Sequence, residues 1–127
     1  MIRIVIEGDC LPAARPRFSG KRAYQPQGNR DYRQLCQWAA KMAMKGAEPL
    51  KCAVAATVKI YRRFQPTSRR FGDVDNFLKA LFDALNQIVF DDDSQIVRCS
   101  VEKFTDKTAP RAEITIEPAE SPKAATD

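Results

Sequence analysis

The sequence is organised around residues 72–86, which read GDVDNFLKALFDALN, and around the acidic run at residues 91–93. Asp73 and Asp75 stand where a helix is expected to start, and Lys79 follows Asp75 by four residues. The spacing of the apolar residues predicts an amphipathic helix that Asp73 or Asp75 caps. The residues expected in its buried stripe are Phe77, Leu78, Leu81, Phe82 and Leu85.

These acidic residues have a structural explanation beside a functional one. A helix dipole favours carboxylates at the helix start, and Lys79 could simply pair with Asp75 one turn away. The acidic run is not explained in this way. If the strand expected over residues 95–104 lies alongside the helix, Asp92 or Asp93 returns to the helix start. Carboxylates clustered there would need hard cations such as Mg²⁺ or Mn²⁺.

The absence of histidine narrows the possible chemistry. Without it the chain has no Ser-His-Asp triad, no histidine base and no histidine-ligated zinc. The cysteines are scattered singly and lack zinc-site spacing, so we expect reduced structural thiols. Any hydrolysis must draw its base from a carboxylate, a lysine or a metal-activated water.

The charge of the chain changes sign at the motif. Residues 1–72 hold 15 Lys and Arg against 4 Asp and Glu, a net charge of +11, whereas residues 73–127 hold 6 against 12, a net charge of −6. A basic surface beside an acidic cluster suits a protein that grips a nucleic-acid backbone and presents it to bound cations. A solvated surface of uneven charge is the alternative.

The segments before the motif predict further regular elements. Alternating residues predict strands over residues 2–6 and 52–64, and apolar periodicity predicts a helix over residues 29–45. We expect Trp38 to pack against the apolar face of this helix or against a partner. The residues expected on that face are Tyr32, Leu35, Cys36, Ala39, Ala40, Met42 and Ala43.

Size and hydropathy indicate one domain without a membrane anchor. A chain of 127 residues fits one compact domain. No apolar run approaches the roughly 20 residues of a membrane span. The first residues are too few and too charged for a signal peptide, so we expect a cytoplasmic protein.

Two basic segments are candidates for nucleic-acid contact. Residues 11–26 hold three prolines and a glycine, which argue against a regular element there. The basic residues of this segment, interleaved with aromatic ones, suit phosphate contact with base stacking, while a solvated loop is the alternative. They are Arg15, Arg17, Lys21 and Arg22. A second segment, residues 62–70, ends in Arg69 and Arg70 directly before the motif.

The motif closely resembles the signature of a known family. GDVDNFLK at residues 72–79, FDALN at 82–86 and DDSQI at 92–96 resemble the RusA family of Holliday junction resolvases, which phages and prophages often carry. RPRF at residues 15–18 and AYQP at 23–26 look like the basic N-terminal segment of that family. The resemblance extends to about residue 117.

The resemblance implies a homodimeric, Mg²⁺-dependent endonuclease that cuts paired strands of a four-way DNA junction during recombination and repair, with Mn²⁺ as a possible substitute. Its catalytic residues would be Asp73, Asp75, Asp93 and Lys79. The metal would be held by Asp73, Asp75 and Asp93, with Asp92 beside them as a further metal-binding residue, and Lys103 would contact DNA. Within the run that begins at Asp91, the position of Asp93 before Ser94-Gln95 favours Asp93 as the ligand.

The expected fold is therefore α+β, with a mixed β-sheet and two main helices in the order β-α-β-α-β-β. The nuclease domain would span residues 1–117 and a disordered tail residues 118–127. By resemblance, the protein would belong to the cytoplasm of a bacterium or to a phage. The rival functions are a metal-dependent nuclease acting on other branched nucleic acids and a non-catalytic phage DNA-binding accessory protein.

Overall fold

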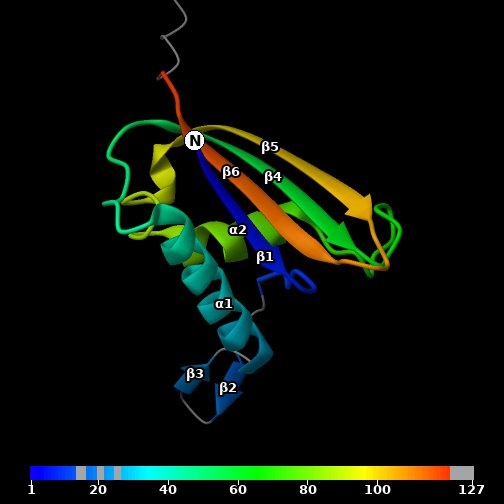
Figure 1. The fold of residues 1–127 in the computed structure, drawn as a ribbon. Helices are drawn as coiled ribbons and strands as arrows, with labels where there is room; N and C mark the ends of the chain where they lie inside the picture. Colours follow the sequence, from blue (N-terminus) through cyan, green and yellow to red (C-terminus); the bar gives the residue numbers. More distant parts are fainter. Residues whose placement is uncertain (14–16, 20–21, 25–26, 121–127) are drawn as a thin grey trace, which may run out of the picture.

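The computed structural model describes residues 1–13, 17–19, 22–24 and 27–120, with the backbone alone at 17–19 and 22–24. The chain forms a four-stranded sheet of order β1-β6-β4-β5, two long helices and a small two-stranded hairpin (Figure 1). Apart from the hairpin and one short 3₁₀ turn, the elements follow the order β-α-β-α-β-β. The predicted α+β fold with a mixed sheet is therefore confirmed.

The main sheet combines antiparallel and parallel pairs. β1 (Ile2–Glu7) pairs antiparallel with β6 (Arg111–Pro118), which pairs antiparallel with β4 (Val54–Arg62). β4 then runs parallel to β5 (Ile96–Thr105). We call the two ends of the sheet the Val54 end and the Arg62 end, after the first and last residues of β4.

Both long helices, α1 (Gln27–Met44) and α2 (Val74–Leu85), pack on one face of the sheet. The inward residues of the strands join the buried residues of both helices in one hydrophobic cluster. α2 buries Phe77, Leu81, Phe82, Ala84 and Leu85, which confirms most of the predicted stripe, while Leu78 is half-buried.

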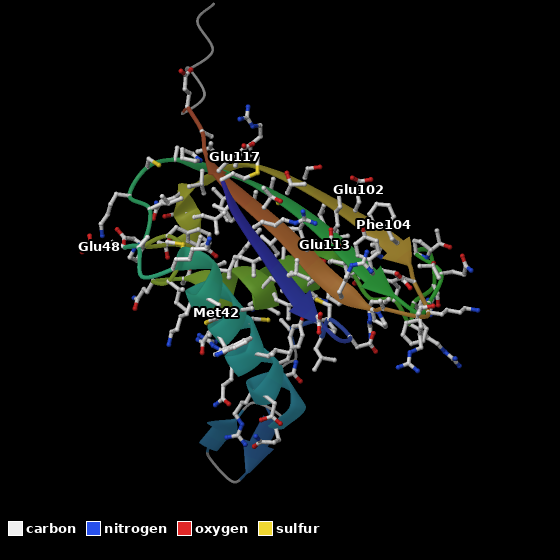
Figure 2. All side chains as sticks on the ribbon, viewed as in Figure 1. Met42, Glu48, Glu102, Phe104, Glu113 and Glu117 are labelled. Carbon is white, nitrogen blue, oxygen red and sulfur yellow. The ribbon has the colours of Figure 1, made fainter. Side chains whose placement is uncertain are left out.

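None of the described helices covers the other face of the sheet (Figure 1). Tyr61 faces this side, because Ile60 and Arg62 beside it point inward. Its ring stacks on Phe104 at 4.9 Å between centroids, and the Arg111 guanidinium lies over it at 3.8 Å. Figure 2 labels Phe104 on β5 in this region.

The direction of α2 decides where the acidic residues lie. α2 begins at the Arg62 end, because the carbonyl of Phe71, just before the helix, accepts a hydrogen bond from the Arg62 side chain. It finishes at the Val54 end, where the N–H of Leu50 donates to the carbonyl of Val89. β5 starts at that same end, because Ile96 pairs with Val54. The register then shifts between Val54 and Ala55.

One local prediction, that residues 11–26 contain no regular element, is wrong. Residues Arg17–Ser19 (β2) and Arg22–Tyr24 (β3) form an antiparallel hairpin. The three prolines of this segment occupy sequence positions 12, 16 and 26, so neither strand contains one and every strand residue keeps its N–H.

The buried face of α1 also differs from the prediction. The residues that pack inward are Tyr32, Cys36, Ala40 and Met44, a row with a spacing of four. Leu35, Trp38 and Met42 lie on the surface, with 41%, 63% and 60% of their areas exposed. Met42 is labelled on α1 in Figure 2. The predicted Ala39 and Ala43 are partly buried and pack against the core, so only the larger side chains at 35, 38 and 42 stay outside.

The end of the described chain continues the sheet. β6 reaches Pro118, and the N–H of Ala119 donates to the carbonyl of Ala53 at 2.8 Å. The rest of the expected tail, residues 121–127, lies outside the described residues. Among the described helices, none has the length and apolarity that a membrane crossing requires.

Candidate functional site

The start of α2 presents two carboxylates to solvent. Asp73 occupies the N-cap position, but its side chain makes no capping hydrogen bond. Asp75 lies in the first turn, and both residues are exposed. Among the described residues, no hydrogen bond or ion pair engages either carboxylate. The two side chains are therefore available for a ligand, at a helix end whose dipole favours negative charge.

The residue before these carboxylates fixes the helix start. Gly72 has a φ of +104°, which side-chain-bearing residues rarely adopt. A Cβ atom placed on Gly72 would lie 2.8 Å from Cζ of Phe77, which is fully buried. Phe77 in turn meets the buried ring of Phe71 edge-on at 6.1 Å. The backbone turn into Asp73 is thus packed against the core.

Arg62 holds the loop that leads to the motif. It is buried, and its guanidinium donates to the carbonyls of Phe71 and Arg70 and to the carboxylate of Asp9. The guanidinium also lies over the rings of Phe64 and Phe77, at 5.1 and 5.6 Å from their centroids. The burial of Arg62 could have been predicted from the sequence, because Arg62 continues the alternating inward positions of Val58 and Ile60 along β4.

The two predicted lysines have different surroundings. Lys79 is exposed on α2 one turn after Asp75, and within the described chain no ion pair joins it to a carboxylate. Lys103 is half-buried: its Nζ donates to the carbonyl of Pro66 at 3.2 Å and lies 5.1 Å from the centroid of the Phe71 ring. Lys103 thus supports the loop before the motif, and its contact with DNA stays a prediction.

Basic side chains lie at the Arg62 end of the sheet, where α2 starts. Arg69 and Arg70 are exposed in the loop before it. Nearby, a surface pocket of about 580 Å³ is lined by Arg63, Phe64, Lys107 and Pro110. Of the basic residues predicted in the first segment, Arg17 and Arg22 belong to the β2–β3 hairpin, while Arg15 and Lys21 lie outside the described residues.

The acidic run at the other end of α2 is largely occupied. Asp91 pairs with Lys51 at 3.0 Å. Asp92 caps the 3₁₀ turn η1 (Asp93–Gln95): its carboxylate accepts from the N–H of Ser94 at 2.9 Å, which lowers the pKa of Asp92. In return, the side chain of Gln95 accepts from the N–H of Asp92. These two aspartates have structural roles.

Asp93 is the member of the run without such a role. It is the first residue of η1 and is half-buried, and in the part of the chain that the structure describes its carboxylate has no hydrogen bond or ion pair. The turn that carries it is fixed, because the Gln95 amide donates to the carbonyls of Leu50 and Cys52 at 2.8 and 2.9 Å. Asp93 is therefore held in place with a free carboxylate.

One chain does not bring the predicted aspartates together. Asp93 lies at the Val54 end and Asp73 at the Arg62 end, and the nine residues of β4 between these ends span about 26 Å. Within the described ranges, no group of three or more His, Cys, Asp or Glu side chains could hold a metal ion. The oxygen ligands fit Mg²⁺ chemically, but a single chain does not gather them. Because β5 runs parallel to β4, it begins at the Val54 end. Asp93, which lies just before β5, is therefore at the end of the sheet away from the start of α2.

The cysteines stand apart from this chemistry. All four are free thiols, with Cys10 and Cys36 buried and Cys52 and Cys99 exposed. Burial raises the pKa of Cys10 to about 11 and that of Cys36 to about 12, which suppresses the reactive thiolate. The two buried thiols are therefore poor nucleophiles, and the expectation of reduced cysteines without a catalytic role stays a prediction.

Two comparisons with known proteins bear on the site. A family model described as "Endodeoxyribonuclease RusA" matches residues 7–117, which include both acidic segments. An uncharacterized protein of Bacillus subtilis strain 168, YqaN, is 44% identical over 52 residues. That match covers 41% of this chain and 34% of the relative, so the chain spans about a third of the length of that curated protein.

Proposed function

Because the chain belongs to the RusA family of endodeoxyribonucleases, we propose that it is a Mg²⁺-dependent nuclease that resolves four-way (Holliday) DNA junctions in recombination and repair. The observation that carries the proposal is the pair of exposed carboxylates at the start of α2, Asp73 and Asp75, inside the matched region. Phosphodiester hydrolysis by paired cuts would be the reaction.

The donor chemistry of this pair suits a hard divalent cation, with Mn²⁺ as a possible substitute for Mg²⁺. When such a cation is bound, it supplies a lowered water pKa and neutralisation of phosphate charge. Asp73 and Asp75 would serve as ligands, with Asp93 as the third predicted carboxylate. The protein's part is to position the residues that carry these oxygens, and the packing of Gly72 against Phe77 restricts the backbone just before Asp73.

Lys79 would act on the phosphate from the same side of α2. Its ammonium lies one turn from Asp75 and has no competing ion pair among the described residues. A positive charge at that place would stabilise the negative charge that develops on the phosphate during hydrolysis. We therefore expect Lys79→Ala to lower turnover more than DNA affinity.

The basic surface near the start of α2 would position the DNA. Arg69, Arg70, Arg63 and Lys107 lie at the Arg62 end with exposed side chains. Phosphate contacts from such residues release counterions, so binding should weaken steeply with salt. An affinity that barely changes between low and physiological salt would contradict this assignment.

Paired cuts in two strands call for two sites of one kind. A twofold homodimer supplies two such sites, because the symmetry axis relates the same site in one copy to that in the other. We therefore propose a homodimer as the active species. Sedimentation or light scattering in the presence and absence of junction DNA measures this directly.

The decisive experiment compares substrates. Purified protein is incubated with labelled four-way junctions, forks, flaps and linear duplex, with Mg²⁺ or with EDTA. We expect Mg²⁺-dependent, paired cleavage of the junction, and loss of cleavage with retained binding in Asp75→Asn. Preferred cutting of forks or flaps would indicate a nuclease for other branched substrates. Binding without cleavage under all conditions would indicate a non-catalytic DNA-binding protein.

A further inference from the structure

We infer that the surface pocket lined by Arg63, Phe64, Lys107 and Pro110 binds an unpaired nucleobase of the DNA substrate. The inference rests on the proposed nuclease function and adds a base-binding element to it. Its basis is the combination of an aromatic ring with basic side chains, which proteins use to bind unpaired nucleotides through stacking and phosphate contact.

The pocket has the size and the lining that a nucleotide requires. Its volume of about 580 Å³ falls within the roughly 300–1,000 Å³ of pockets that bind small organic ligands. Phe64 and Pro110 contribute apolar surface, whereas Arg63 and Lys107 contribute positive charge. A flat base and the phosphates on either side of it match these two kinds of surface.

The ring of Phe64 is held in place and still lines the pocket. The guanidinium of the buried Arg62 lies 5.1 Å from the centroid of this ring, and the hydroxyl of Thr105 donates to the Phe64 carbonyl at 2.8 Å. Phe64 itself is only half-buried. A ring fixed in this way loses little conformational freedom when a base stacks on it.

The other aromatic residues at the Arg62 end are already occupied. On the open face of the sheet, Tyr61 has Phe104 of β5 and Arg111 of β6 opposite it on its two sides. Both neighbours contact its ring, at 4.9 and 3.8 Å from its centroid. The rings of Phe71 and Phe77 are fully buried. Phe64 is therefore the ring at this end that is placed to receive a base.

The turn between β5 and β6 fixes another part of the pocket. Lys107 lies in this turn, where the Asp106 carboxylate accepts hydrogen bonds from the N–H groups of residues 108 and 109 at 2.9 and 3.0 Å. The carbonyl of Pro110 accepts from the N–H of Gly8 at 2.9 Å. The backbone around the pocket is thus organised before any ligand binds.

The charges beside the pocket favour a polyanion. Arg62 and Arg63 share one carboxylate, that of Asp9, at 3.4 and 3.6 Å. Within the described ranges, no carboxylate pairs with Lys107. Two positive charges therefore remain uncompensated in this group, and they suit the phosphates that flank a bound base.

The pocket lies at the same end of the sheet as the start of α2. The Arg62 guanidinium contacts the rings of both Phe64 and Phe77, and Phe77 packs against Gly72 directly before Asp73. A strand whose base is held at Phe64 is therefore kept at the end that carries the exposed carboxylates. Because an unpaired base needs no extrusion from a duplex, the pocket favours branched over linear DNA.

Binding to matched duplexes tests the inference without cleavage. The labelled probes share one sequence: one is fully paired, one carries a single unpaired thymine, and one has an abasic nucleotide in place of that thymine. Each is titrated with protein in the presence of EDTA. We expect the wild type to bind the duplex with the unpaired thymine about tenfold more tightly than the other two, as for one base stacked on an aromatic ring.

Phe64→Leu keeps an apolar side chain but removes the ring. It should reduce the tenfold preference to less than about twofold, and the abasic nucleotide should then cause no further loss, because both changes remove the same contact. Phe104→Leu is the matched control. Phe104 is also half-buried, but it stacks on Tyr61 on the open face of the sheet, so this variant should keep the preference. Urea unfolding checks that both variants are folded.

A second readout uses the unaltered protein, so it does not depend on how a variant folds. The unpaired thymine is replaced by iodouracil, the complex is irradiated, and mass spectrometry identifies the cross-linked residue. We expect the cross-link at Phe64. A cross-link mapped outside the pocket, or an unchanged preference in folded Phe64→Leu, would overturn the inference. Mg²⁺-dependent junction cleavage by the wild type would leave the proposed function standing in that case, whereas a wild type that binds these probes but cuts no DNA would refute the function alone.

Discussion

The two ends of α2 carry similar acidic residues with different roles. At the Val54 end, Asp91 pairs with Lys51 and Asp92 caps η1. At the Arg62 end, Asp73 stands at a cap position without making the cap bond. A run of aspartates is therefore not one functional unit. What separates a structural carboxylate from a candidate ligand is whether the protein already uses its oxygens.

The largest expected effect tests this contrast in activity. Asp75→Asn should lower junction cleavage by at least about 10³-fold, because losing a metal ligand removes several kcal/mol of charge stabilisation. Asp92→Asn, in the acidic run, should stay within about threefold of the wild type, since a missing cap does not touch the reaction. Single-turnover cleavage of a labelled junction measures both. Equal losses would mean that the two acidic segments do not differ in role.

The next effect concerns the support of the Arg62 end. Arg62→Met should lower the free energy of unfolding by about 3 kcal/mol, because it leaves Asp9 and two carbonyls without their buried donor. Arg63 also pairs with Asp9, at 3.6 Å, but its side chain is 63% exposed. Arg63→Met should therefore change stability by at most about 1 kcal/mol. Urea unfolding of both variants compares a buried and an exposed partner of one carboxylate.

A smaller effect isolates the packing of the turn before Asp73. Gly72→Ala should cost about 2 kcal/mol, since it combines a positive φ with a clash against Phe77. Gly46 also has a positive φ, +82°, yet a Cβ there meets nothing within 4 Å. Gly46→Ala should therefore cost only about 1 kcal/mol of backbone strain. Thermal unfolding measures the stability lost in each variant, and the two losses should differ only by the cost of the clash. Equal losses would show that the Phe77 ring moves aside without cost.

The smallest effect is the pH dependence of the cap at the Val54 end. The Ser94 hydrogen bond lowers the pKa of Asp92 below its ordinary value of 3.8. A lowered folded-state pKa contributes stability above the unfolded value and loses it as pH falls through the folded one. The wild type should thus exceed Asp92→Asn in stability at pH 7, and this difference should shrink below about pH 4. A difference that persists unchanged at low pH would rule out the cap as its cause.

Local patterns in the sequence predicted the parts of this fold that depend on local chemistry. The alternation of Val54, Ala56, Val58 and Ile60 predicted β4, and the spacing of Phe77, Leu81 and Leu85 predicted the buried stripe of α2. The resemblance of the motif predicted membership of the RusA family, which the family match over residues 7–117 confirms. The catalytic roles of Asp73, Asp75, Asp93 and Lys79 remain predictions.

The parts that failed depend on how elements meet. Two apolar rows run along α1, and only the contact with the sheet decides that Cys36 is buried while Trp38 is exposed. Likewise, nothing local in β5 specifies that it pairs parallel to β4. That single choice of direction places Asp93 at the Val54 end. The position of one carboxylate thus follows from sheet topology, which residue patterns do not encode.

The pairing of β1 with β6 has a practical consequence for engineering circular permutants and fusions of this protein. Ile2 lies opposite Ile116, so the chain enters and leaves the sheet side by side at the Val54 end. A short linker between these points would let the chain be circularly permuted, with new ends opened in the turn around Lys107 between β5 and β6. Reporter domains attached before Ile2 or after Pro118 would sit at the Val54 end, away from the basic Arg62 end.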